Sequence, residues 1–155
     1  MNILFVEDDD EKAQRIIESV RSDFPQAHLV RERSFNSGLR VLAARAASFN
    51  LVLLDMTLPT YDTTPSETGG GHVEHFAGRD LLAQMELRHL RIPTVVVTML
   101  DSFGEGTKKA SLETLMQELE DQYSSNFVGH VYYNATEEGW RGALRKMIQA
   151  HARLS

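Results

Sequence analysis

The stretch that decides the fold is NILFVEDD, residues 2–9, in which four apolar residues run directly into three acidic ones. A short run that is apolar throughout predicts a strand of a parallel sheet, because both faces of such a sheet are covered. Acids at the end of this strand lie at the carboxyl edge of the sheet, where open parallel sheets gather their chemistry. Acids at strand ends can also simply cap the helix that follows, so the remaining strands must decide between the two interpretations.

The same alternation of short apolar runs and amphipathic stretches continues along the chain. Further strands are predicted at residues 28–30, 51–54, 95–97 and 127–132, and helices at residues 13–24, 39–46, 81–90, 112–119 and 140–148. Strands alternating with helices build a parallel sheet with helices on both faces. We therefore predict a doubly wound α/β fold with five parallel strands and five helices in three layers.

Composition narrows the class of protein. The chain has 155 residues, of which 42% are hydrophobic, and it has no cysteine, which excludes disulfides and thiolate metal sites. The net charge of −6 argues against a nucleic-acid surface. The first apolar run is too short for a signal peptide or a membrane span. We expect one cytoplasmic domain over residues 1–155, with no direct nucleic-acid or membrane partner.

Three polar features follow predicted strands. Glu7 and Asp8 follow the first strand, Asp55 follows the third, and Thr98 ends the fourth. Loops after neighbouring strands lie close together, and crowded carboxylates need a cation or a proton to compensate their charge. Oxygen ligands without His or Cys suit Mg²⁺. Asp55 would share the ion and offer a free oxygen as a nucleophile toward phosphorus, and the Thr98 hydroxyl could donate to a phosphoryl oxygen.

These segments resemble the receiver domain of two-component response regulators, and the resemblance covers nearly the whole chain. It is carried by residues 2–9, by LLDMTLP at residues 53–59 and by VVVT at residues 95–98. The implied fold is flavodoxin-like. In this order and spacing the motifs are far more specific than any of them alone.

The resemblance implies a role for each matched residue. Glu7 and Asp8 would be the acidic pair that holds Mg²⁺, Asp55 the phosphoacceptor and Thr98 the switch hydroxyl. The backbone carbonyl of Thr57 would be a further metal ligand. The domain would not be an enzyme but a phosphorelay module, with a histidine kinase or phosphotransfer protein as its donor. Its output would reach an effector protein or a second copy of the chain through the face made by the fourth helix, fifth strand and fifth helix.

The chain departs from the family pattern at three positions. Tyr133 stands where the family has a lysine at the end of the fifth strand, His130 where it has the switch aromatic, and Met99 where it has a small residue. A neutral phenol cannot neutralise an added phosphoryl charge. Lys108 or Lys109 could reach back as a substitute.

Two segments are longer than the family needs, an insertion at residues 60–78 and an extended fourth-helix region at residues 101–126. Each could be a docking element or only a polar connection. The departures leave a second hypothesis open, a pseudo-receiver that signals without phosphorylation. A third and weaker hypothesis is a metal-dependent phosphatase-like enzyme on a related fold.

Overall fold

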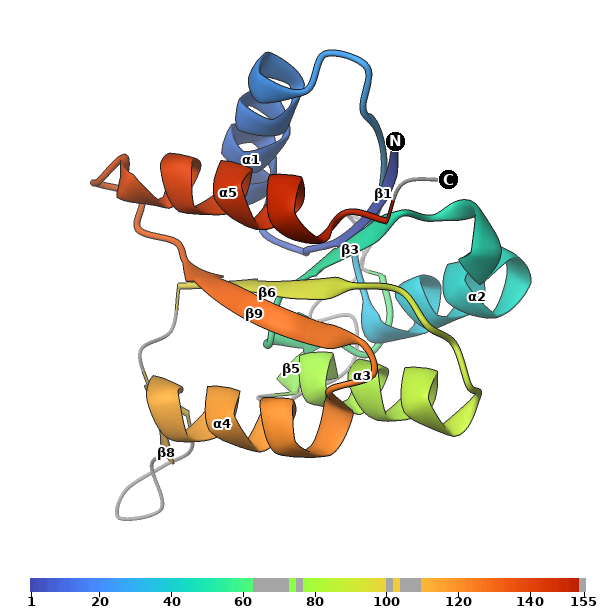
Figure 1. Ribbon diagram of the computed structural model, residues 1–155. Coiled ribbons are helices and arrows are strands. Elements are labelled where there is room, and N and C mark those ends of the chain that lie inside the picture. The colour runs from blue at the N-terminus through green and yellow to red at the C-terminus, as the bar shows by residue number, and fades with distance from the viewer. Residues whose placement is uncertain (63–72, 75–76, 100–101, 104–109, 154–155) are drawn as a thin grey trace.

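A five-stranded parallel sheet forms the centre of the computed structural model (Figure 1). The strands lie in the order β2-β1-β3-β6-β9, with bounds Asn2–Val6 (β1), His28–Glu32 (β2), Leu51–Leu54 (β3), Thr94–Thr98 (β6) and Phe127–Tyr132 (β9). The structure describes residues 1–62, 73–74, 77–99, 102–103 and 110–153. This topology confirms the predicted doubly wound α/β fold.

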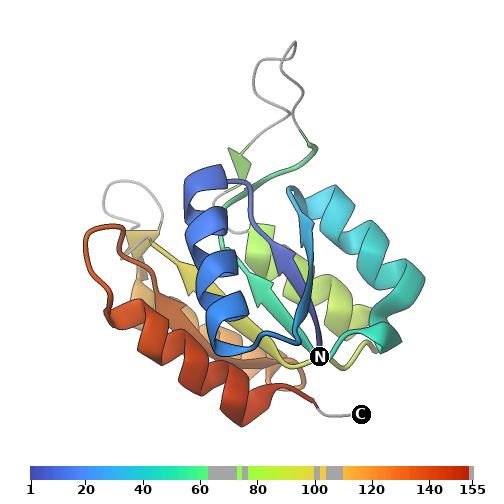
Figure 2. The same cartoon turned by 90° about the horizontal axis from the view of Figure 1, so that it is seen from above.

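Helices cover both faces of the sheet. Figures 1 and 2 show α1 and α5 on one face, and α2, α3 and α4 on the other. Their bounds are Asp10–Asp23 (α1), Phe35–Arg45 (α2), Ala77–Leu87 (α3), Leu112–Tyr123 (α4) and Gly139–His151 (α5), and a 3₁₀ turn, Ala46–Ser48 (η1), follows α2. No helix in the described part of the chain is long and apolar enough to cross a bilayer.

The alternation of side chains along each strand divides the core in two. Phe5 and Leu53 pack on the side of α1 and α5, whereas Val6 and Leu54 pack on the side of α2, α3 and α4. Because successive side chains of a strand point to opposite faces, the residue after Val6 and the residue after Leu54 turn toward α1. The fold thus sends two acidic residues, Glu7 and Asp55, toward the same helix.

A short antiparallel strand pair lies at each of the two long segments. Strand β4, Leu58–Pro59, pairs with β5, Val73–Glu74, and strand β7, Ser102–Phe103, pairs with β8, Ala110–Ser111. The sequence assigns Ala77 and Gly78 to the insertion, but they form the first turn of α3. That helix also ends earlier than predicted, at Leu87, and His89 has a positive φ of 56° just beyond it. Lys108 and Lys109 lie outside the described residues.

Candidate functional site at the carboxyl edge of the sheet

Three carboxylates converge where β1 and β3 end. Glu7, Asp8 and Asp55 each offer an oxygen, and these oxygens all lie within 4.8 Å of one another. Strands β1 and β3 are neighbours in register, with Val6 opposite Leu54, so the residues that follow them are side by side. The Asp55 amide donates to the Val6 carbonyl at 3.1 Å, which fixes the two strand ends to each other.

Glu7 is held from both its backbone and its side chain. Arg31 on β2 donates two hydrogen bonds to the Glu7 carbonyl, at 3.0 and 3.1 Å. The Asp9 amide donates to Glu7 Oε2 at 3.2 Å, and the Asp9 side chain caps α1 by accepting from the Lys12 amide at 3.0 Å. The second oxygen, Glu7 Oε1, is buried and accepts no hydrogen bond among the described residues. A buried carboxylate oxygen in this state needs a cation beside it, and the Lys12 ammonium lies 2.6 Å away.

Asp55 has one oxygen engaged and one available. Its Oδ1 accepts a hydrogen bond from the Met56 amide at 2.8 Å, whereas Oδ2 has no hydrogen-bond partner in the part of the chain that the structure describes. The residue is 6% exposed. Gly78 of α3 supports the loop from behind, because its amide donates to the Met56 carbonyl at 3.0 Å. Among the described residues, Asp55 is therefore a fixed carboxylate whose second oxygen accepts no hydrogen bond.

A lysine that sequence analysis missed lies among these acids. The Lys12 ammonium, from the first turn of α1, is 2.6 Å from Glu7 Oε1 and 3.4 Å from Asp55 Oδ1. The contact with Glu7 is an ion pair between two buried side chains. The ammonium also donates to the Val97 carbonyl on β6 at 2.8 Å. At 1% exposure, Lys12 is a buried cation between the two strand ends.

Three carboxylates surround one ammonium in this cluster, and the pKa values of Glu7 and Asp8 are raised. Burial, and then the charge of Asp55, raises the pKa of Glu7 from 4.5 to about 8, although Lys12 opposes the shift. Burial and the charge of Asp55 also raise the pKa of Asp8. Burial lowers the pKa of Lys12, but the charges of Asp55 and Glu7 more than offset this, so the pKa stays above its ordinary value. The cluster therefore tends to take up a proton when no further cation is present.

The other residues singled out from the sequence lie around this cluster. Thr98 is fully buried at the end of β6, and its carbonyl accepts from the Tyr133 amide at 2.8 Å. Thr57 is partly buried on the connection from Asp55 to β4. Met99 is 47% exposed, immediately after β6.

Tyr133 places an aromatic ring, not a cation, beside the cluster. Its ring is 2% exposed and packs against Trp140 of α5, with ring centroids 5.0 Å apart. Lys12 Nζ and the Arg15 guanidinium each lie 5.9 Å from the centroid of the Tyr133 ring. The Tyr133 hydroxyl accepts from Arg15 at 3.4 Å. Tyr133 thus forms an apolar wall beside the Lys12 ammonium.

Gly78→Ala should disturb the Asp55 loop, because a Cβ at Gly78 would lie 2.4 Å from the Asp55 carbonyl oxygen and 2.9 Å from Met56 Cα. Backbone must move to relieve these contacts, so we expect the free energy of unfolding to fall by about 1–3 kcal/mol in urea titrations. Gly142→Ala is the control, since a Cβ there meets nothing within 4 Å and removes a helical glycine. Equal stability of the two variants would contradict this packing.

The raised pKa of Glu7 predicts a dependence of stability on pH. Between pH 4.5 and about 8 the folded chain keeps a proton that the unfolded chain releases. The stabilisation by this proton is complete below the unfolded-state pKa of 4.5 and is lost as pH rises through the folded-state pKa of about 8. With a chelator present, we expect the free energy of unfolding to fall by up to about 1.4 kcal/mol per pH unit in this window. Urea titrations of Glu7→Gln should show a flatter pH profile, and an unchanged slope would refute the assignment to Glu7.

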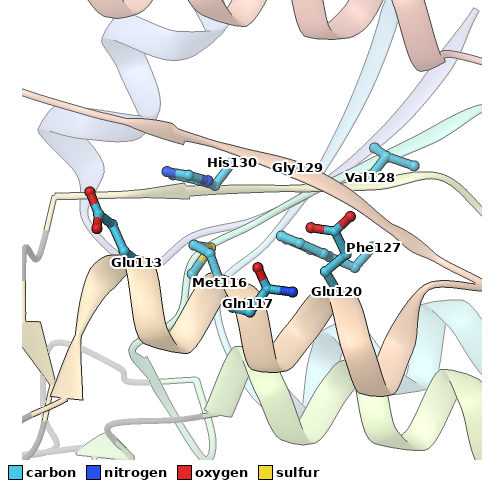
Figure 3. Close-up of a pocket in the computed structure, with 8 residues that line it drawn as sticks. All are labelled: Glu113, Met116, Gln117, Glu120, Phe127, Val128, Gly129 and His130. Carbon is cyan, nitrogen blue, oxygen red and sulfur yellow. The ribbon is translucent and has the colours of Figure 1, made fainter.

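A separate groove lies between α4 and β9 (Figure 3). It has a volume of about 270 Å³. Figure 3 shows Glu113 and His130 at one end and Glu120 and Phe127 at the other. His130 is exposed, although the surrounding protein still lowers the pKa of its imidazole by desolvation. The groove therefore combines an apolar floor with acidic side chains from α4.

Comparison with known proteins places this geometry in a family. No family model matches the chain. The uncharacterized protein y4jR of Sinorhizobium fredii (strain NBRC 101917 / NGR234) is 34% identical over 157 residues, covering 100% of this chain and 98% of that protein. The Detocs response regulatory protein DtcB of Enterobacter cloacae (strain JD6301) is 28% identical, covering 96% of this chain and 98% of that protein. The chain belongs to one family with y4jR, and over nearly its whole length it is similar in sequence to a response regulatory protein.

Solved receiver structures share the fold. The phosphorylated cyanobacterial phytochrome response regulator RcpA matches with a TM-score of 0.64 and 19% identity, covering 97% of this chain and 92% of that one. The Mn²⁺-bound form of response regulator Rcp1 matches with a TM-score of 0.62 and 19% identity, covering 96% and 91%. At this identity the likeness concerns the fold alone.

Proposed function

We propose that this receiver domain accepts a phosphoryl group on Asp55 in a phosphorelay, with a divalent cation held by Glu7, Asp8 and Asp55. The observation that carries the proposal is the convergence of three carboxylates around an Asp55 whose Oδ2 has no hydrogen bond among the described residues. We take the domain to span residues 1–155, with two long connections. The response-regulatory name of DtcB and the phosphorylated state of RcpA support this function.

The donor set fits a hard divalent cation. The three carboxylates supply oxygen ligands only, and they outnumber Lys12, the one ammonium that pairs with them among the described residues. Oxygen ligands of this kind suit Mg²⁺, or Mn²⁺ as in the Rcp1 structure. We assign the Thr57 carbonyl as a further ligand. When bound, the cation offsets negative charge on the transferring phosphoryl group.

The residues of the chain perform the transfer by position and charge. Asp55 Oδ2 forms a bond to phosphorus as the bond from phosphorus to the donor's leaving group breaks, and that group departs with the electron pair. Oδ1 stays fixed by the Met56 amide, which keeps the nucleophilic oxygen in place. The Thr98 hydroxyl donates to a phosphoryl oxygen in the product. A histidine kinase or phosphotransfer protein supplies the group as a phosphohistidine.

The output surface is assigned to the groove between α4 and β9. It lies on the far side of the sheet from α1 and borders β9, which pairs with β6 through Thr98 and Tyr132 (Figures 1 and 3). A shift of Thr98 on phosphorylation would pass along this pair to the groove. An effector protein, or a second copy of the chain, would dock there.

Small-molecule phosphorylation tests the proposal. With Mg²⁺ and acetyl phosphate or phosphoramidate, we expect the wild type to gain the mass of one phosphoryl group, and Asp55→Asn to gain none. Intact-mass spectrometry measures the label, and loss of the label in a chelator shows the dependence on metal. Asp121→Asn, an exposed change on α4, is the matched control and should label like the wild type.

The second candidate function is a pseudo-receiver that signals by protein contact alone. The buried Tyr133 favours it, because the family's lysine position holds a ring packed on Trp140. A wild type that takes no label from any donor, with partner binding unchanged in Asp55→Ala, would support this candidate and remove the first.

A further inference from the structure

The four lysines of the chain are Lys12, Lys108, Lys109 and Lys146. Among the described residues, Lys12 is the lysine whose ammonium reaches the carboxylate cluster, at 2.6 Å from Glu7 and 3.4 Å from Asp55. It comes from the first turn of α1, at the opposite end of the chain from the strand that carries this function in the family.

We infer that Lys12 replaces the family's missing lysine: its ammonium binds the phosphoryl group on Asp55 and senses the added charge from helix α1. The inference rests on the proposed function of Asp55. It assigns to Lys12 the role that Tyr133 cannot fill.

The contacts of the ammonium suit this role. Lys12 Nζ has three N–H groups, and one is donated to the Val97 carbonyl at 2.8 Å, which anchors the ammonium to β6 one residue before Thr98. The contact of the ammonium with Asp55 Oδ1, at 3.4 Å, is longer than its contacts with Glu7 and with the Val97 carbonyl. A phosphoryl group on Oδ2 adds negative charge and strong acceptor oxygens beside this ammonium. A charge-assisted hydrogen bond to one of these oxygens is therefore favoured over the long contact with Oδ1.

Other charged groups near the cluster are already engaged. Arg15, one turn further along α1, donates to the Ala135 carbonyl and to the Tyr133 hydroxyl, and pairs with Glu138 at 3.3 Å. Arg31 donates to the Glu7 backbone carbonyl and pairs with Asp10 at 3.0 Å. These cations brace the surrounding loops, whereas the Lys12 ammonium faces the carboxylates themselves.

The Tyr133 ring makes this arrangement possible. The centroid of the ring lies 5.9 Å from Lys12 Nζ, and the ring packs against Trp140. A lysine at residue 133 would bring a second ammonium into the same space. Lys12 and Tyr133 thus exchange the two roles: the cation comes from α1, and an aromatic ring stands at the end of β9.

The first test observes Lys12 in the unaltered protein. The wild type is labelled with ¹⁵N-lysine, and the Lys12 ammonium resonance is assigned from its loss in Lys12→Arg. Beryllofluoride with Mg²⁺ serves as the phosphoryl mimic. We expect the Lys12 resonance to shift on saturation and that of Lys146, which is exposed on α5, to stay in place. Binding of beryllofluoride with no shift of Lys12, or with a shift of Lys108 or Lys109 instead, would overturn the inference and leave the proposed function standing.

The second test moves the cation. Lys12→Met should weaken beryllofluoride binding by about 10- to 100-fold, the loss expected for a hydrogen bond between charged groups. The double variant Lys12→Met with Tyr133→Lys should recover most of this loss, because the ammonium returns to the strand end. Lys146→Met is the matched control and should bind like the wild type. If Lys12 had only a structural role, a lysine at position 133 would not restore beryllofluoride binding, and that result would contradict the inference.

The two proposals fail in different ways. A wild type that takes neither acetyl phosphate label nor beryllofluoride overturns the proposed function, and this inference with it. A wild type that labels normally, together with a folded Lys12→Met that binds beryllofluoride as tightly as the wild type, overturns the inference alone.

Discussion

Lys12→Met is expected to lower the free energy of unfolding by about 3–5 kcal/mol, because removing one partner of a buried ion pair leaves the other charge uncompensated. The ammonium is 1% exposed and lies 2.6 Å from Glu7 and 3.4 Å from Asp55. Its loss also leaves the Val97 carbonyl without its donor. Urea unfolding monitored through Trp140, the single tryptophan, measures the effect.

The control for this prediction is Lys146→Met, an equal change on the exposed side of α5, which we expect to alter stability by less than about 0.5 kcal/mol. Adding Glu7→Gln to Lys12→Met removes the facing charge and should recover part of the loss, since the two residues are coupled. Additive effects of the two substitutions would show that the contact between Lys12 and Glu7 contributes no coupling.

A divalent cation should produce the second large effect. A ligand that binds only the folded state stabilises it by about 2.7 kcal/mol at a concentration of 100 times its Kd. We expect Mg²⁺ or Mn²⁺ to raise the Tm in differential scanning fluorimetry, and a chelator to reverse the rise. Binding should displace the proton that Glu7 holds below pH 8, so apparent affinity should increase from pH 6 to pH 8.

Asp8→Asn tests the site of this cation with little damage to the fold, because Asp8 is exposed and yet contributes an oxygen to the cluster. The variant should lose most of the metal-dependent rise in Tm. Asp23→Asn, at the exposed end of α1, should keep it. A rise that persists in Asp8→Asn and Asp55→Asn would place the cation elsewhere.

The fold was predictable because its main signals are local. Continuous apolar runs such as residues 3–6 and 51–54 predicted the buried strands of the parallel sheet. The start of α3 was predicted too late, since Ala77 and Gly78 follow a polar, glycine-rich segment. Only the tertiary contact of Gly78 with the backbone of Asp55 and Met56 explains why a glycine begins this helix.

The approach of Glu7, Asp8 and Asp55 was also foreseeable, because parallel neighbouring strands end at one edge. Lys12 was not, since a lysine in a first helical turn is usually solvated. One signal was present: Lys12 precedes Ile16 by four residues and so shares the buried face of α1.

The position of Lys12 bears on how sequences of this family are sorted. A receiver is readily classed as degenerate when the residue after its last strand is not basic, as at Tyr133 here. In this molecule a lysine five positions after the first acidic residue reaches the carboxylates from helix α1. Surveys of degenerate receivers should therefore look for chains that lack the lysine after the last strand but carry one at the position of Lys12. Such chains would be grouped as receivers with a relocated lysine and not as inactive ones.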